Sequence, residues 1–215
     1  MPPKLIIYDL DNTLVMTRPA AKIGYQQAIY FIAKKHGLYR DRNKLYHHWK
    51  RLVHSLKVDP KPYKRRFAFS LGLLLDKHQL PHTHLNQALH LYEKTLLTHI
   101  RTAKGAKELL SSCHDASLKQ VVTTGSDAVE AVHKLKAVSL YSLIDLLITA
   151  FDIGSMKPHS DYYLKPMAHF KVSPNQTVVI GDHQAEDIAP ALKLGLTVYR
   201  VTPQSHLMEF QKHLF

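Results

Sequence analysis

The sequence predicts an α/β protein in which a parallel sheet with helices on both faces is interrupted by a second, all-helical domain. Three observations support this fold class. Short apolar runs alternate with segments of helical spacing along most of the chain, as expected for a parallel sheet. Residues 18–100 contain no convincing strand pattern. The excess of positive charge lies entirely within that same block.

Five apolar runs are predicted to be the strands of the sheet. They are continuous rather than alternating, which is typical of parallel strands buried on both faces. The runs are Leu5–Tyr8, Gln120–Thr123, Leu146–Thr149, Thr177–Ile180 and Thr197–Val201. Four segments with helical spacing lie between them: Ala106–Cys113, Asp127–Val138, Ser160–Phe170 and Asp187–Leu194. We therefore expect an α/β core made of residues 1–17 and 101–215.

Residues 18–100 form the predicted helical domain. Apolar residues recur there at helical spacing, and breaks suggest about four helices. The breaks fall near Gly37–Asn43, Asp59–Pro62 and Gln79–His82. Most of the aromatic residues, Tyr63 among them, are expected to pack between these helices. The block carries 16 Lys and Arg against 4 Asp and Glu, with its densest run at Lys64-Arg65-Arg66. Solvated helix faces and an anion-attracting surface both agree with this charge.

The composition excludes several classes of protein. The hydrophobic fraction of 45% is sufficient for a globular core. The single cysteine, Cys113, excludes an internal disulfide. The apolar run at the N-terminus, Leu5–Tyr8, is too short for a signal peptide or a membrane span. We therefore expect a soluble, cytoplasmic protein that does not enter a membrane.

Two aspartates, Asp9 and Asp11, follow directly after the first predicted strand. Residues two apart in an extended chain point to the same face, so these carboxylates are expected to project together. Two like charges at one place need a cation or a shared proton. The carboxyl ends of parallel strands are also where open sheets bind ligands. A turn or a helix cap is the structural alternative for the run Asp9-Leu10-Asp11-Asn12-Thr13.

Hydroxyls and a glycine follow the second predicted strand, at Thr123-Thr124-Gly125-Ser126. A phosphate can accept hydrogen bonds from a hydroxyl and from the backbone N–H groups where a helix begins. The alternative is a helix start without a ligand, because Asp127 and Glu130 form an acceptable capping pair.

A lysine and a group of acids follow the third and fourth predicted strands. Lys157 lies in a predicted loop, unlike Lys165, whose Lys-Pro dipeptide falls in a segment of helical spacing. Gly181 is expected to let the backbone turn sharply. Asp182, Glu186 and Asp187 come after it, and such an acidic loop opposite Asp9 offers oxygen ligands for Mg²⁺. A solvated lysine and an acidic helix N-terminus are the alternatives.

The four signals, in this order, resemble the haloacid dehalogenase-like superfamily of phosphotransferases. The resemblance covers nearly the whole core and includes the stretch from Gly181-Asp182 through Asp187-Ile188 to Gly195-Leu196. It implies a Rossmann-like core, and it implies that residues 18–100 are a helical cap inserted after the first strand.

The resemblance also implies roles for the residues that match the family's motifs. Asp9 is the implied nucleophile, and Asp11 is the implied general acid and then base. Thr124, Gly125 and Lys157 are implied to bind the phosphoryl group, with Thr124 and Lys157 acting in catalysis. The implied Mg²⁺ ligands are Asp9, the backbone carbonyl of Asp11, and the side chains of Asp182 and Asp187.

Three positions depart from the family's pattern. Thr123 and Thr124 both offer a hydroxyl, and the following Gly125 favours Thr124. Glu186 and Asp187 both follow Asp182, and the register of Ile188 and Gly195 favours Asp187. His183 stands where relatives commonly have a small hydroxyl residue, and a half-exposed loop histidine is the favoured interpretation.

The predicted activity is hydrolysis of a phosphomonoester that is a small anionic metabolite, a nucleotide or another organic phosphate. The acid at Asp11 favours phosphoryl transfer over dehalogenation, because a halide leaves without a proton. The alternatives are a phosphomutase of the same superfamily and a basic protein that binds polyanions or nucleic acid. Nucleic acid is the less favoured partner, and the oligomeric state is left open.

Overall fold

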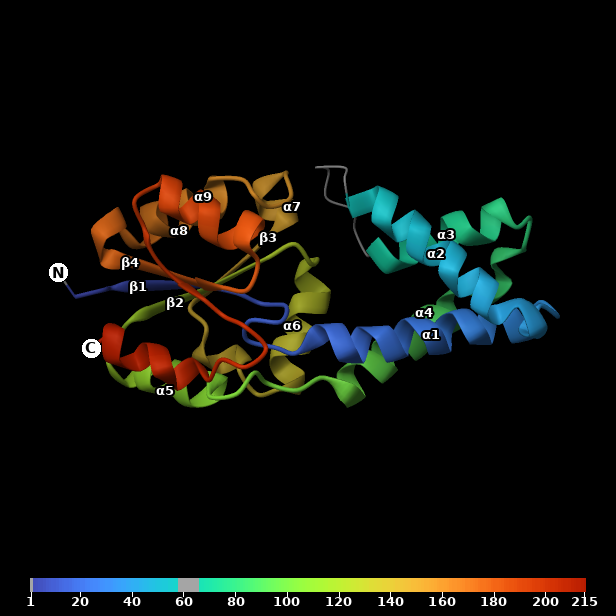
Figure 1. The fold of residues 1–215 in the computed structure, drawn as a ribbon, viewed down its shortest axis with the longest axis horizontal. Coiled ribbons are helices and arrows are strands. Elements are labelled where there is room, and N and C mark those ends of the chain that lie inside the picture. The colour runs from blue at the N-terminus through green and yellow to red at the C-terminus, as the bar shows by residue number, and fades with distance from the viewer. Residues whose placement is uncertain (1, 58–65) are drawn as a thin grey trace. The chain divides into compact units, whose positions relative to one another are not determined.

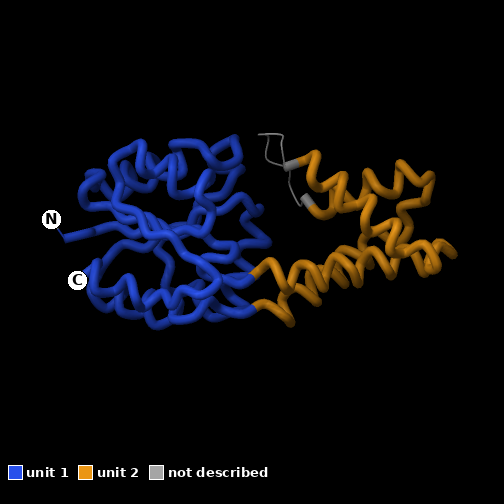
Figure 2. Tube along the Cα trace, viewed as in Figure 1, with its two compact units in different colours: residues 1–16, 101–215 blue, residues 17–100 orange. Residues whose placement is uncertain are grey.

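The computed structural model describes residues 2–57 and 66–215 of the chain. Tyr63 and the basic pair Lys64-Arg65 therefore lie outside the described residues, as does the predicted break at Asp59–Pro62. The chain divides into two compact units, residues 1–16 with 101–215 and residues 17–100 (Figure 2). These limits differ by one residue from the boundaries predicted from the sequence.

The first unit is built on a five-stranded parallel sheet, which confirms the predicted fold class. The strands are β1 (Leu5–Asp9), β2 (Lys119–Thr124), β3 (Leu146–Thr149), β4 (Thr177–Gly181) and β5 (Thr197–Arg200). Their order across the sheet is β3-β2-β1-β4-β5. Each predicted strand is found to within one residue at either end.

β1 occupies the centre of the sheet because its side chains suit burial on both faces. Leu5, Ile6, Ile7 and Tyr8 are completely buried. β1 pairs with β2 on one side and β4 on the other, with Asp9 opposite Thr123. The chain builds the sheet outward from β1 in one direction and then in the other. The carboxyl end of β1 is therefore the switch point at which such sheets bind ligands.

Helices cover both faces of this sheet. Figure 1 shows α8 (Asp161–Phe170) and α9 (Ala189–Lys193) on one face, and α5 (Ala106–Asp115) with η6 (Leu207–His213) on the other. The α8 face is packed by Tyr162, Tyr163 and Met167. The remaining elements are α6 (Ala128–Ala137), η3 (Tyr141–Leu143), α7 (Ala150–Ile153), η4 (Pro174–Gln176) and the π-helical turn η5 (Gln184–Ile188).

In its described part, the second unit consists of helices: α1 (Thr17–Lys35), α2 (Arg42–Lys57), α3 (Arg66–Lys77) and α4 (Leu85–His99), with the short turns η1 (Tyr39–Asp41) and η2 (His82–His84). Aromatic side chains from each of these helices pack together. Tyr25 lies 4.5 Å from Trp49 and 4.8 Å from Tyr92 between ring centroids, and Phe67 lies 4.3 Å from Tyr92. Among the residues that the structure describes, no helix is long and apolar enough to cross a membrane.

Candidate active site

Three carboxylates meet at the carboxyl edge of the sheet. Asp9 ends β1, Asp182 follows β4, and Asp187 lies in η5. One oxygen from each lies within 4.8 Å of the others. Carboxylate oxygens are the ligands that Mg²⁺ prefers in proteins, so this donor set fits that cation. Asp187 is only 2% exposed, which makes a solvated acidic surface a poor description of the group.

Gly181 gives Asp187 the space to reach this position. A Cβ atom at Gly181 would lie 2.6 Å from Cβ of Asp187, closer than such atoms approach. Gly181 is the last residue of β4, and the chain bends at the next residue, Asp182, without a positive φ at Gly181. The close approach of the Asp187 side chain, which the sequence did not indicate, is what excludes a larger residue here.

Lys157 joins two of the three carboxylates. Its Nζ lies 2.8 Å from Oδ1 of Asp9 and 2.8 Å from Oδ1 of Asp187, and it also donates to the backbone oxygen of Thr123 at 3.1 Å. Burial lowers the pKa of Lys157, but the two carboxylates outweigh it, so the pKa lies above its ordinary value. The other Lys-Pro lysine, Lys165, lies in α8 and donates to the backbone oxygen of Asp152.

The charges of this group do not balance within the protein. Three carboxylates face one ammonium group, and the Asp9 side chain is only 13% exposed. Burial raises the pKa of Asp9 to about 7, with Lys157 lowering it and Asp187 raising it. A divalent cation would supply the positive charge that the group lacks.

The two threonines at the end of β2 lie in different surroundings. The Thr123 hydroxyl is 3.4 Å from the backbone oxygen of Tyr8, within the sheet. The Thr124 hydroxyl accepts from the backbone N–H of Ser126 at 3.1 Å and lies 3.5 Å from Oδ2 of Asp11. Of the two hydroxyls, that of Thr124 is therefore the one that lies beside Asp11. At Gly125 an added Cβ would lie 2.8 Å from Cε of Met156.

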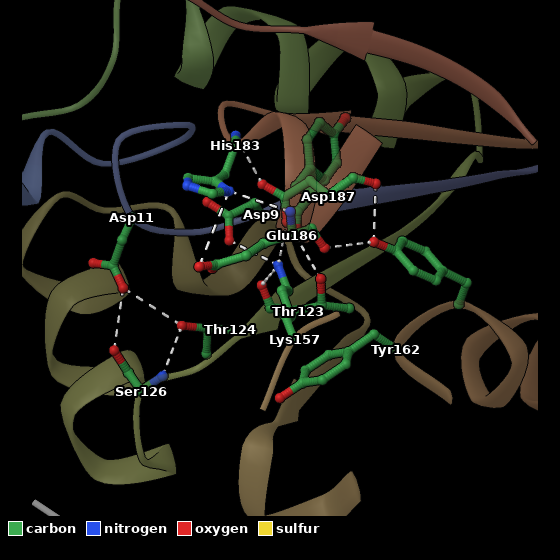
Figure 3. A network of polar contacts seen from close by, with 12 residues as sticks. Asp9, Asp11, Thr123, Thr124, Ser126, Lys157, Tyr162, His183, Glu186 and Asp187 are labelled. Atoms are coloured by element: carbon green, nitrogen blue, oxygen red, sulfur yellow. Dashed lines mark hydrogen bonds and ion pairs between the residues drawn. The ribbon is translucent and has the colours of Figure 1, made fainter. Parts of the chain in front are cut away.

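Asp11 has its own set of partners, separate from the three clustered carboxylates. Figure 3 shows its carboxylate turned toward Thr124 and Ser126, away from Asp9 and Asp187. The Ser126 hydroxyl donates to Oδ2 at 3.1 Å, and Nζ of Lys134 lies 2.8 Å from Oδ1. The ligand atom that the resemblance implies for Asp11 is its backbone carbonyl, and that role stays a prediction.

Lys134 was not selected from the sequence. Its side chain is 2% exposed, and it also lies 2.7 Å from Oε1 of Glu130 one helical turn away. The pattern of α6 contains a signal that could have found it. Lys134 shares the inward helical stripe with Ala131, Leu135 and Val138, where an apolar residue is expected.

Residues 6–201 match the family model of the haloacid dehalogenase-like hydrolases. This match includes all three clustered aspartates, Asp9, Asp182 and Asp187. The chain belongs to the haloacid dehalogenase-like hydrolase family. It is an enzyme of the phosphatase type, since curated relatives that align with most of its length are named phosphatases.

Curated relatives agree with this membership, and a solved structure shares the fold. The chain is 25% identical over 195 residues to a glyceraldehyde 3-phosphate phosphatase of Pyrococcus abyssi, covering 90% of this chain and 79% of the relative. It is 26% identical to the haloacid dehalogenase-like hydrolase domain-containing protein 3 of Xenopus laevis, covering 94% and 85%. The HAD-hydrolase YfnB of Bacillus subtilis, solved with magnesium bound, superimposes with a TM-score of 0.74 at 17% identity, over 100% and 99% of the two chains.

In the acidic loop of this hydrolase, the side chains of His183 and Glu186 lie outside the cluster of three aspartates. Both side chains are about half exposed, and Nδ1 of His183 accepts the backbone N–H of Glu186 at 3.2 Å. The buried Tyr163 hydroxyl lies 2.9 Å from the backbone oxygen of Asp187 and 3.1 Å from that of Glu186. Tyr163, in α8, therefore holds the backbone of this loop through its hydroxyl, a role that the sequence pattern did not indicate.

Proposed function

We propose that this hydrolase is a Mg²⁺-dependent phosphomonoesterase that acts through an aspartyl-phosphate on Asp9. The observation that carries the proposal is the position of the Asp9 carboxylate. It contacts the buried ammonium of Lys157 at 2.8 Å and lies in one group with Asp182 and Asp187. A phosphoryl group that reaches this carboxylate therefore finds fixed positive charge and potential cation ligands beside it.

The reaction takes place in two displacements at phosphorus. In the first, a carboxylate oxygen of Asp9 bonds to phosphorus, the ester P–O bond breaks, and Asp11 gives its proton to the leaving alkoxide. In the second, water attacks the phosphorus and Asp11 takes its proton. The bond between phosphorus and Asp9 breaks, and inorganic phosphate leaves. Lys157 and the Thr124 hydroxyl bind the phosphoryl oxygens in both steps, together with the backbone N–H of Gly125.

The carboxylates of Asp9, Asp182 and Asp187, with the backbone carbonyl of Asp11, are the proposed ligands of Mg²⁺. The cation, when bound, supplies positive charge that offsets these carboxylates and the phosphoryl group. Lys157 keeps the Asp9 carboxylate oriented, and Gly181 leaves room for Asp187.

The proposed substrate is a small phosphorylated metabolite that carries negative charge. The alkyl phosphate named for the Pyrococcus relative, glyceraldehyde 3-phosphate, belongs to this chemical class. Residues 17–100 are proposed to act as the cap that selects the leaving group. The two connections of this unit to the core lie close to Asp11 in the chain, since Val15 pairs with both Asp11 and Thr102. The excess positive charge of this unit favours an anionic substrate.

The proposal is tested by release of inorganic phosphate from glyceraldehyde 3-phosphate, a nucleoside monophosphate and p-nitrophenyl phosphate. We expect turnover with Mg²⁺, none after addition of EDTA, and none in the Asp9→Asn variant. Release of phosphate that persists in Asp9→Asn would rule out the aspartyl-phosphate. Conversion of a sugar phosphate into its isomer without release of phosphate would instead identify a phosphomutase.

A second candidate activity, binding of a polyanion by the helical unit, is favoured by the surface of α2. This helix contains no acidic residue, and Lys44, Lys50 and Arg51 are exposed on it, with Lys44 and Arg51 seven residues apart on one face. Contacts to phosphates make binding steeply dependent on salt. We expect a 20-nucleotide oligonucleotide to bind about tenfold or more weakly at 200 mM than at 50 mM NaCl. A Lys50→Glu, Arg51→Glu variant that binds like the wild type would exclude this surface.

A further inference from the structure

A buried lysine of α6, Lys134, lies against the residue proposed as general acid. Its ammonium group has three protons, and the structure gives it three acceptors. They are Oδ1 of Asp11 at 2.8 Å, Oε1 of Glu130 at 2.7 Å and the Ser126 hydroxyl at 3.2 Å. The hydrogen-bonding capacity of this ammonium is therefore filled.

The stability of α6 alone does not explain a lysine at this position. The side chain is 2% exposed, on the helical stripe that also carries Ala131 and Leu135. Burial of an ammonium group costs free energy that its ion pairs commonly only offset, so an apolar side chain of similar size would serve packing as well. What the lysine adds is a fixed direction for the Asp11 carboxylate.

The two oxygens of Asp11 receive different partners as a result. Oδ1 faces the Lys134 ammonium, which can only donate hydrogen bonds. Oδ2 faces the hydroxyls of Ser126 and Thr124, at 3.1 Å and 3.5 Å, and hydroxyls can either donate or accept. When Asp11 holds a proton, that proton belongs on Oδ2, because a proton on Oδ1 would oppose the ammonium.

The direction of this carboxylate also suits the displacement at phosphorus. Attacking and leaving oxygens are roughly in line, so the leaving oxygen departs on the side opposite the nucleophile. Figure 3 shows the Asp11 carboxylate on the Thr124 side of the site, turned away from Asp9. Lys134 and Ser126 hold it there.

We infer that Lys134 is a positioning residue, which fixes Asp11 so that Oδ2 carries the proton delivered to the leaving group. This inference rests on the proposed phosphatase function. Lys134 remains protonated throughout and contributes no proton of its own. Its influence should therefore depend on how much the leaving group needs a proton.

The test compares a leaving group that needs a proton with one that does not. An alkoxide, as from glyceraldehyde 3-phosphate, requires protonation by Asp11, whereas p-nitrophenolate leaves as the anion. The ratio kcat/KM covers the steps up to departure of the leaving group, so the later attack of water does not enter it. For Lys134→Met we expect kcat/KM to fall about 10- to 100-fold with the alkyl phosphate and less than about threefold with the aryl phosphate.

Glu130→Gln is the matched control, because it removes the other carboxylate beside Lys134 and leaves the contact with Asp11 in place. It is expected to change kcat/KM less than about threefold with either the alkyl or the aryl phosphate. In an Asp11→Asn background, Lys134→Met should have no further effect on the aryl phosphate, since the residue it positions is gone. If Lys134→Met does not fold, Ser126→Ala takes its place as the test. It removes one donor to Oδ2 and should give a smaller loss of kcat/KM in the same direction.

The outcomes separate this inference from the function on which it rests. An equal loss with both substrates, or no loss with either, would overturn the positioning role while leaving the phosphatase intact. A wild-type protein that releases no phosphate from either substrate would contradict the proposed function itself. Selective loss with the alkyl phosphate, beside an unchanged Glu130→Gln variant, would support the role of Lys134.

Discussion

Two buried lysines lie at the carboxyl edge of the sheet, and each contacts two carboxylates. Lys157, in the loop before α8, contacts Asp9 and Asp187, whereas Lys134, in α6, contacts Asp11 and Glu130. Their side chains are almost equally buried, at 4% and 2% exposed. Their carboxylate partners differ more, because Asp9 and Asp187 are 13% and 3% exposed while Asp11 and Glu130 are 29% and 30% exposed.

This difference indicates which group of charges needs a cation. The group around Lys157 includes a third acid, Asp182, and Asp187 within it is almost completely buried, whereas Asp9 and Asp182 are half-buried. Water therefore screens the excess negative charge around Lys157 only in part, and a cation would offset it. Around Lys134 the carboxylates reach solvent, so water screens the remaining charge and no metal is required. The first group is suited to bind a cation and a phosphoryl group, and the second to hold one side chain in place.

The largest effect is expected from Lys157→Met. The substitution removes the positive charge beside the proposed nucleophile and leaves two buried carboxylates without their partner. We expect kcat to fall about 10²- to 10³-fold. The free energy of unfolding in EDTA should fall by about 3–5 kcal/mol, because an uncompensated buried charge remains. Steady-state kinetics and urea unfolding measure the two effects.

Lys165→Met is the control for this prediction, since it alters the other Lys-Pro lysine, on the surface of α8. Its kcat and stability should stay close to the wild type. A similar loss of kcat in both lysine variants would mean that Lys157 has no specific role in the reaction. The proposed difference between Lys157 and Lys134 would then not hold.

A smaller effect is expected from Gly181→Ala, which tests whether the carboxylate group depends on close packing. The new Cβ would lie 2.6 Å from Cβ of Asp187, and neither atom is the far end of a flexible side chain. Asp187 must shift, so we expect Mg²⁺ affinity to fall about 10- to 100-fold. Overpacking should lower the free energy of unfolding by about 1–3 kcal/mol. Titration calorimetry with Mg²⁺ measures the affinity.

Gly72→Ala provides the matched glycine control. Gly72 lies in α3, and the nearest atom to an added Cβ is 3.8 Å away. Alanine favours a helix over glycine by about 0.5–1 kcal/mol, so this variant should be slightly more stable and bind Mg²⁺ normally. If Gly181→Ala also bound Mg²⁺ normally, Asp187 would not depend on the space beside Gly181.

The same comparison shows how much of the site the sequence could predict. Asp9 and Thr124 end a strand, and Lys157 and Asp182 come after one. The topology of a parallel sheet brings these strand ends together. Position in a loop distinguished Lys157 from Lys165. These arguments need only local patterns and their order along the chain, and the strands themselves were predicted to within one residue.

The group around Lys134 was beyond such arguments. Its main contact joins residues 123 positions apart, and the pattern that places Lys134 on the inward stripe of α6 does not reveal which residue it meets there. The space that Gly181 leaves for Asp187 was also not predicted, because that neighbour is a side chain six residues later. The helix α7, at Ala150–Ile153, is a single turn and too short to show a periodic pattern.

The smallest effect is expected at His183, which lies next to Asp182 but outside both groups. Its Nδ1 accepts the N–H of Glu186, as a capping residue does at the start of a helical turn. His183→Ala should therefore lower the free energy of unfolding by about 0.5–1 kcal/mol, and His183→Ser, which restores a capping oxygen, should recover most of it. Both variants should keep the kcat and the Mg²⁺ affinity of the wild type. A loss of Mg²⁺ affinity above tenfold in His183→Ala but not in Glu186→Gln would place this histidine in the cation site. The group around Lys157 would then include an imidazole beside its three carboxylates.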